Sequence, residues 1–246
     1  MENKTTRLNK FISETGYCSR READRLITEG KVTVNGTIPE LGTKVNADDL
    51  VVIDGKTLSV PGEFLYFAFH KPVGVICTTE TNVRDNIIDY INYSKRIFPV
   101  GRLDRASEGL IFMTNDGDIV NKILRAGNNH EKEYIVTVDK PISAKFITEM
   151  SNGIPILDTI TKNCFVEKTG KNEFRIILTQ GMNRQIRRMC DYLDFHVQRL
   201  IRTRIMNVTL EGLEPGKLRE LTKEEMQKIN ELLTSSSKTA EASNID

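Results

Sequence analysis

The order of strand-like and helix-like segments most constrains the fold of this 246-residue chain. Between residues 64 and 210, short apolar or alternating runs typical of strands outnumber helical runs and do not alternate with them one for one. A doubly wound parallel sheet requires that alternation, because parallel crossovers usually contain a helix. The sequence therefore predicts an α+β fold with a mixed, largely antiparallel sheet and flanking helices.

Individual segments carry this prediction. We expect strands in FLYFAF, in the continuous apolar run LIFM, in KEYIVTV, in EFRIILTQ and in VQRLIRTRIMNVTL (64–69, 110–113, 132–138, 173–180 and 197–210). The segments IVNKILRAG, KFITEMSNGI, NRQIRRMCDYL and TKEEMQKINELL have helical spacing of apolar residues (119–127, 145–154, 183–193 and 222–233). Asn183 is the expected N-cap of the arginine-rich helix.

The first sixty residues form a separate pattern. RLNKFISETG and SRREADRLITEG read as two short helices, the second opening with Ser19 and Glu22 at capping-box spacing. KVTVNG and DLVVIDGK read as strands, and Pro61 and Gly62 as a linker. We expect three regions: a helix-hairpin domain at 1–62, a larger domain at 63–234 and a disordered polar tail at 235–246.

Several classes of protein are disfavoured. No apolar run approaches the roughly 20 residues that span a bilayer, and the N-terminus lacks the apolar stretch of a signal peptide, so we expect a cytoplasmic protein with no membrane partner. The four cysteines and three histidines are scattered without metal-ligand spacing. No P-loop or GxGxxG motif is present. We therefore expect neither a metal nor a cofactor.

Positive charge is concentrated late in the chain. Residues 171–204 contain eight basic and three acidic residues, a net charge of +5, although the whole chain carries only +1. Arg184 and Arg188 would lie one turn apart on one side of their helix, with Arg187 offset. An exposed basic face is one interpretation; a phosphate-facing surface is favoured because Arg199, Arg202 and Arg204 follow.

The motif GRLDRASEGL, residues 101–110, places Asp104 between Arg102 and Arg105 just before a buried strand. Turns favour aspartate, and a surface ion pair is an equally simple explanation. A catalytic carboxylate is the third possibility, and a nearby arginine would then lower its pKa and keep it ionised. Gly101 and Gly109 would serve as flexible points of this loop. Local physics alone favours the turn or the ion pair.

The N-terminal segment RLNKFISETGYCSRREADRLITEGKVTVNG resembles an S4-type RNA-binding domain. Residues 1–62 hold nine basic and nine acidic residues, so bulk charge does not separate an RNA-binding face from a solvated one. The resemblance implies that basic residues of the two helices face RNA. The candidates are Arg7, Lys10, Arg20, Arg21 and Arg25.

The remainder resembles RNA pseudouridine synthases, which isomerise uridine in RNA. GRLDRASEGLIFMTNDGDI is similar to their central motif, and HKPVG, KEY and GMNRQIRRM fall where the other motifs occur (70–74, 132–134 and 181–189). With the S4-type module in front, the chain resembles the RsuA family of bacterial rRNA pseudouridine synthases over about residues 5–233. Segments such as RTRIMNV bring it nearest to members that modify large-subunit rRNA.

The resemblance also implies roles for individual residues. Asp104 corresponds to the catalytic aspartate, Tyr134 would stack on the target base and remove a proton, and Arg184 would pair with Asp104. Leu200 would line the base pocket. Lys71, Arg102, Arg187 and Arg188 are further candidates for substrate binding.

We expect the partner to be RNA, foremost 23S rRNA, and the protein to be a monomer that flips its target base out of the helix. Small-subunit rRNA and tRNA remain alternative substrates. A non-catalytic S4 protein that only binds RNA or assists ribosome assembly is the alternative from a different functional class; the joint presence of Asp104, Tyr134 and Arg184 disfavours it.

Overall fold

The computed structural model describes residues 5–59, 62–80, 82–125 and 128–234. It divides into two compact units: unit 1 comprises residues 1–65 with the short segments 93–97 and 115–117, and unit 2 comprises the rest. The division lies near the expected boundary at residue 62, but unit 1 also takes in two segments from later in the chain. Pro61 and the expected disordered tail lie outside the described residues.

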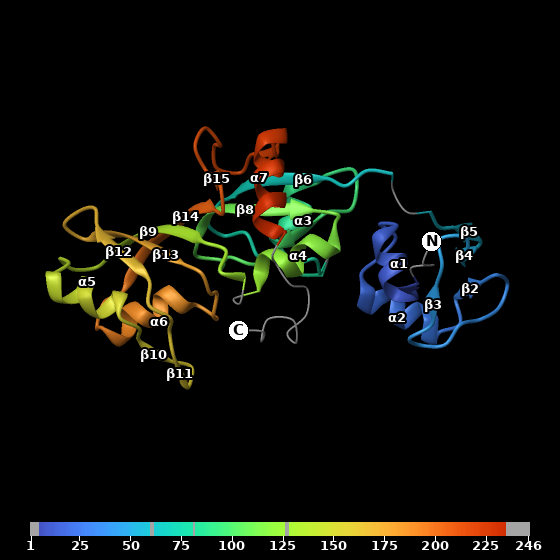
Figure 1. Cartoon of the computed structure of the whole chain (residues 1–246), viewed down its shortest axis with the longest axis horizontal. Coiled ribbons are helices and arrows are strands. Elements are labelled where there is room, and N and C mark those ends of the chain that lie inside the picture. Colours follow the sequence, from blue (N-terminus) through green and yellow to red (C-terminus); the bar gives the residue numbers. More distant parts are fainter. Residues whose placement is uncertain (1–4, 60–61, 81, 126–127, 235–246) are drawn as a thin grey trace. The chain divides into compact units, whose positions relative to one another are not determined.

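Unit 1 packs two helices against short strands (Figure 1). The helices are α1 (Leu8–Glu14) and α2 (Arg20–Thr28), and the strands are β1 (Thr6–Arg7), β2 (Val32–Val34), β3 (Lys44–Val45), β4 (Val51–Ile53) and β5 (Lys56–Thr57). Apolar residues from both helices and from β2, β3 and β4 form its core, which includes Leu8, Ile12, Ala23, Val32 and Ile53.

The predicted ends of these two helices are confirmed. Ser19 accepts a hydrogen bond from the Glu22 backbone N–H at 3.2 Å, and Gly16 and Gly30 adopt positive φ after α1 and α2. The capping box is only half formed, because the Glu22 side chain pairs with Arg25 instead of the Ser19 backbone.

Unit 2 is built on one mixed sheet, which confirms the predicted fold class. Within the described residues it has nine strands in the order β12-β13-β9-β14-β8-β6-β16, with β15 paired to β14 and β7 to β8. All pairs are antiparallel except β14 with β8. The strands are β6 (Tyr66–Lys71), β7 (Phe98–Val100), β8 (Glu108–Thr114), β9 (Lys132–Val138), β12 (Phe165–Lys168), β13 (Glu173–Leu178), β14 (Val197–Ile205), β15 (Val208–Thr209) and β16 (Leu218–Glu220).

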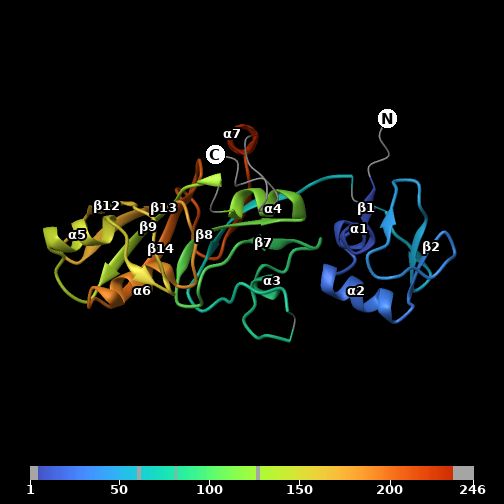
Figure 2. The same cartoon turned by 60° about the horizontal axis from the view of Figure 1, so that its bottom comes forward.

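Helices cover both faces of this sheet. They are α3 (Ile87–Ile91), α4 (Gly117–Leu124), α5 (Ala144–Ser151), α6 (Gln185–Tyr192) and α7 (Lys223–Leu233). Figure 2 shows α4 and α7 on one side of the sheet and α6 on the other. Apolar residues of α4 and α7, such as Ile123 and Ile229, pack on Leu110 and Phe112 of β8. Helix α7 begins with a complete capping box between Thr222 and Glu225.

Gly109 lies where β8 meets β14. The two strands pair in parallel through only two residue pairs, Ile201 with Glu108 and Arg202 with Gly109. A Cβ atom on Gly109 would lie 2.3 Å from the Arg202 carbonyl oxygen, and its φ is +112°. Gly109 is therefore a close-approach position and not the flexible point that we expected; only glycine fits there.

One further expectation is wrong, and one hairpin was not predicted. Asn183 does not cap α6: Arg184, in a left-handed conformation, is the N-cap, and the Asn183 side chain accepts a hydrogen bond from Arg188 instead. The sequence pattern also missed the two-stranded hairpin of β10 (Pro155–Ile156) and β11 (Thr159–Ile160). Its turn uses Leu157 and Asp158 at positive φ, without the Asn-Gly signal that marks such turns.

Candidate active site

A pocket of about 430 Å³ lies in unit 2 where β9, β14 and the N-terminus of α6 meet the loop before β8. Most of the residues singled out from the larger domain line it: Arg102, Asp104, Tyr134, Arg184, Arg187 and Leu200. Among the described residues that line the pocket, Lys132 and Arg202 join Arg102, Arg184 and Arg187, so that five side chains are cationic. The same residues include only one carboxylate, that of Asp104. The pocket is therefore suited to an anionic ligand.

The loop that carries Asp104 is held from several directions. The Leu103 N–H contacts Cys77 Sγ at 3.4 Å, and Ser107 N–H donates to the Asp104 carbonyl at 3.0 Å. Gly74 N–H donates to the Arg105 carbonyl at 2.8 Å, and Arg105 Nε donates back to the Gly74 carbonyl at 3.1 Å. The HKPVG segment thus fixes the position of the aspartate loop.

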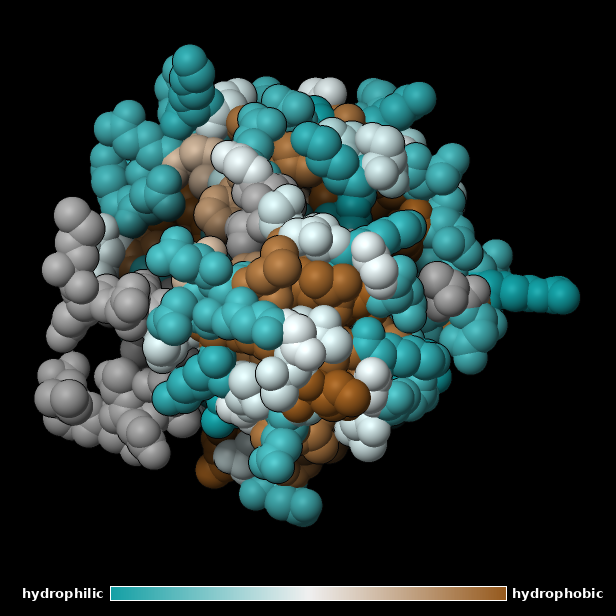
Figure 3. All heavy atoms as spheres, turned by 90° about the vertical axis from the view of Figure 1, so that its right-hand side faces the viewer, coloured by the Kyte–Doolittle hydropathy of each residue, from teal (hydrophilic) through white to brown (hydrophobic). Residues whose placement is uncertain are grey.

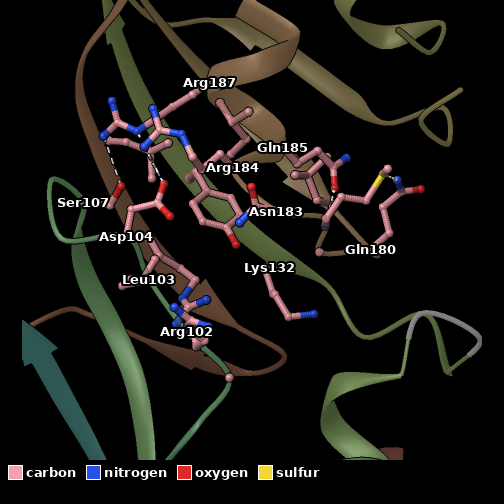
Figure 4. A pocket seen from close by; sticks show the side chains of 18 of the residues that line it. Arg102, Leu103, Asp104, Ser107, Lys132, Gln180, Asn183, Arg184, Gln185 and Arg187 are labelled. Atoms are coloured by element: carbon pink, nitrogen blue, oxygen red, sulfur yellow. Dashed lines mark hydrogen bonds and ion pairs between the residues drawn. The ribbon is translucent and has the colours of Figure 1, made fainter. Parts of the chain in front are cut away.

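Asp104 lies between two arginines of the α6 segment (Figure 4). Its Oδ2 is 3.6 Å from Arg187 Nε and 3.9 Å from Arg184 Nη1. The side chain of Arg184 is 49% exposed and that of Arg187 only 11%. The sequence pattern pointed to Arg184 as the partner; the structure adds Arg187 as the closer and more deeply buried one.

Arg187 also joins three parts of the chain. Its Nη2 donates to the Ala106 carbonyl and to Ser107 Oγ, both at 3.1 Å, and its Nη1 donates to the Val197 carbonyl at 3.3 Å. Burial lowers the pKa of the guanidinium, and the charge of Asp104 opposes that effect. Arg187 therefore positions the aspartate loop against α6 and the start of β14.

Strands β9 and β14 supply the floor of the pocket. Tyr134 is 8% exposed and pairs with Arg202 across the two strands, so both side chains emerge on the same face. Leu200 is 6% exposed and lies two residues earlier on β14. An aromatic ring and an aliphatic side chain beside a carboxylate can hold a planar base against the reacting group.

Two predicted substrate-binding residues do not line the pocket. Lys71 is completely buried, and its Nζ donates to the carbonyls of Pro72 and Val75 at 2.9 and 2.8 Å. It supports the HKPVG segment and cannot contact RNA, so that interpretation of Lys71 is wrong. Arg188 turns back to hydrogen-bond Asn183.

The basic residues of unit 1 differ in availability. Arg7, Arg20 and Arg21 are exposed, whereas Arg25 pairs with Glu22 and Glu29, and Lys10 pairs with Glu14 at 3.4 Å. Figure 3 views the molecule from the right-hand side of Figure 1 and shows hydrophobic residues at the surface among hydrophilic ones. The large exposed apolar residues of unit 1 include Ile38, Leu41 and Leu50.

Other chemistries receive no support from the described part of the chain. No group of three or more histidine, cysteine or acidic residues there could hold a metal ion. No helix within the same residues has the length and hydropathy needed to cross a membrane. Burial raises the pKa of the Cys164 thiol to about 11 and that of Cys190 still further, so neither thiol is activated.

Comparison with known proteins finds relatives for both parts of the chain. Residues 65–192 match a family model described as RNA pseudouridylate synthase, and residues 6–59 match the S4 domain. The chain is 54% identical to the dual-specificity RNA pseudouridine synthase RluF of Salmonella typhi, over 98% of this chain and 84% of that protein. It is 34% identical to the ribosomal large subunit pseudouridine synthase B of Bacillus subtilis, over 92% and 96% of the two chains.

A solved structure, described as the crystal structure of a pseudouridylate synthase, has the same fold. It is 28% identical, with a TM-score of 0.67, and the match covers 91% of this chain and 99% of that one.

Proposed function

The chain belongs to the RNA pseudouridine synthase family, and on that premise we propose that it isomerises uridine in large-subunit ribosomal RNA with Asp104 as the catalytic carboxylate. The observation that carries this proposal is the convergence of Asp104, Tyr134, Arg184 and Leu200 on one pocket. These residues come from four separate segments, and the fold brings them together around the only carboxylate in the described lining.

The reaction needs little more than these groups. The C1′–N1 bond of uridine breaks, the uracil turns, C1′ bonds to C5, the proton on C5 leaves and N1 gains a proton. Asp104 would act at the glycosidic bond, held in place by Arg184 and Arg187 at 3.9 and 3.6 Å. Tyr134 would stack on the uracil and accept the C5 proton, and Leu200 would pack against the base.

Access to the base requires that the nucleotide leave its helix, which costs a few kcal/mol. The cationic pocket supports the proposal that phosphates around the target supply part of the compensating binding energy. The S4 domain of unit 1 would add contacts to the RNA through exposed Arg7, Arg20 and Arg21.

Names of the relatives guide the choice of RNA. The Bacillus subtilis relative is named for the large ribosomal subunit, and the RluF relatives are named dual-specificity enzymes. We therefore place large-subunit rRNA first, and we extend the proposal to a second class of RNA, for which tRNA is the candidate.

The test compares a strain that lacks this protein with strains that carry the wild type or Asp104→Asn. Pseudouridine is mapped chemically in large-subunit rRNA, small-subunit rRNA and tRNA. The proposal expects a site in large-subunit rRNA that is modified with the wild type and unmodified in the other two strains. Full modification by Asp104→Asn would remove Asp104 from the mechanism, and an unchanged large-subunit profile would remove that RNA as substrate.

A further inference from the structure

Two buried cations in the pocket have no acidic partner in the part of the chain that the structure describes. Lys132 on β9 is 7% exposed, and its Nζ makes one long hydrogen bond, 3.3 Å to the His130 carbonyl. Arg202 on β14 is 4% exposed; its Nε donates to the Leu110 carbonyl at 2.6 Å, but its buried Nη2 has no partner. Among the described residues no carboxylate forms an ion pair with either side chain.

Burying a positive charge without an acidic partner costs free energy. Burial, together with the positive charge of Arg202, lowers the pKa of Lys132 to about 8. The groups that face Lys132 are His130 and Arg202, and neither is an acid. Buried charges are ordinarily paired, and an unpaired one suggests a ligand that supplies the opposite charge.

The other buried lysine of unit 2 provides a contrast. Lys71 is equally enclosed, but its Nζ donates to two backbone carbonyls, at 2.9 and 2.8 Å, and it does not line the pocket. These contacts of Lys71 stabilise the HKPVG segment, which explains why a lysine is buried at this position. The contacts of Lys132 provide no comparable explanation, and Lys132 lines the pocket.

The position of Lys132 separates it from the reacting carboxylate. Figure 4 shows Asp104, Ser107, Arg184 and Arg187 gathered on one side of the pocket, while the Lys132 ammonium lies apart and is directed away from Asp104. Uracil is neutral and cannot offset two cations, whereas each phosphodiester of RNA carries a full negative charge. We propose that Lys132 and Arg202 bind the backbone phosphate adjoining the flipped uridine.

This inference rests on the proposed function, and its test is kept separate from it. The RNA is the class that loses a pseudouridine in the deletion strain, isolated from that strain and therefore unmodified. Modification is followed in single turnover with protein in excess, so that the protein concentration at half-maximal rate reports RNA affinity and the rate at saturation reports the chemistry. The variants are Lys132→Met and Lys132→Arg.

Lys228→Met is the control, because this exposed lysine of α7 pairs with Glu231 and lies outside the pocket. We expect Lys132→Met to raise the half-maximal concentration about tenfold, since a charge-assisted hydrogen bond to phosphate is lost. The slope of log affinity against log salt falls by about one. The saturating rate stays within about threefold of wild type, and Lys132→Arg restores most of the affinity.

Lys132→Met also keeps or raises the thermal midpoint, because an unpaired buried charge is removed. An unchanged half-maximal concentration and salt slope would overturn the phosphate site. A loss confined to the saturating rate would overturn it as well, since the lysine would then act on the chemistry. If no RNA loses a pseudouridine in the deletion strain, the proposed function itself fails.

Discussion

Replacing Arg187 with methionine tests how the aspartate loop is held. The guanidinium donates to Ala106, Ser107 and Val197 and lies 3.6 Å from Asp104, while its side chain is only 11% exposed. Methionine keeps much of the aliphatic stem and removes all four contacts. The substitution therefore removes the contacts that hold the aspartate loop against α6 and connect it to β14.

The magnitude follows from those contacts. Each hydrogen bond contributes about 0.5–1.5 kcal/mol net, and the 3.3 Å bond to Val197 belongs at the lower end. Removing a partly desolvated cation returns some of this free energy. We expect the free energy of unfolding to fall by about 2–3 kcal/mol, and the single-turnover rate to fall on the order of a hundredfold, because Asp104 loses its alignment.

Arg184→Met is the matched control, since Arg184 also pairs with Asp104 but is 49% exposed. We expect it to lower the rate while the unfolding free energy changes by less than about 0.5 kcal/mol. Urea unfolding followed by far-UV circular dichroism, with single-turnover modification of RNA, measures both quantities. If Arg187→Met is as stable as wild type, Arg187 does not anchor the loop and the reasoning is refuted.

Two other predictions concern stability alone. Gly109→Ala brings a Cβ atom to 2.3 Å from the Arg202 carbonyl oxygen at φ +112°, so we expect the free energy of unfolding from urea titration to fall by more than about 3 kcal/mol. The control is Gly181→Ala, where no atom lies within 4 Å and the free energy of unfolding changes by less than about 0.5 kcal/mol. Similar small effects at both sites would contradict the close approach. Lys132 has a pKa of about 8 in the folded protein against an ordinary 10.5, so between these values the unfolded chain binds more protons and stability rises with pH, by on the order of 3 kcal/mol across the window. Unfolding measured from pH 7 to 10.5 should show this rise in the wild type relative to Lys132→Met, and parallel profiles would argue against a buried ammonium.

The sequence predicted those features that depend on local pattern. The buried run after Glu108, the alternation in β13 and the start of α7 at Thr222 all follow from periodicity and capping chemistry. The fold class followed from the order of these elements. The site residues Asp104, Tyr134 and Arg184 came from motif resemblance, since local physics alone left Asp104 as a turn or an ion pair.

Roles that depend on long-range contacts were missed or mistaken. Arg187 is buried because α6 packs against the aspartate loop, some eighty residues away in sequence. The resemblance made Lys71 a candidate for substrate binding, yet its ammonium lies in the interior and donates to two carbonyls. That Lys132 and Arg202 have no acidic partner among the described residues becomes visible only when β9 and β14 lie side by side. The spacing of residues in the sequence does not show whether a buried cation will have an acidic partner in the fold.

The short parallel ladder between β8 and β14 affects when the active site can form during synthesis and folding. It joins segments about ninety residues apart through two residue pairs, and contacts between such distant segments form late in folding. Asp104 precedes this ladder on one strand, while Leu200 and Arg202 lie on the other. A nascent chain cannot assemble the pocket, or act on RNA through it, until residue 205 has left the ribosome.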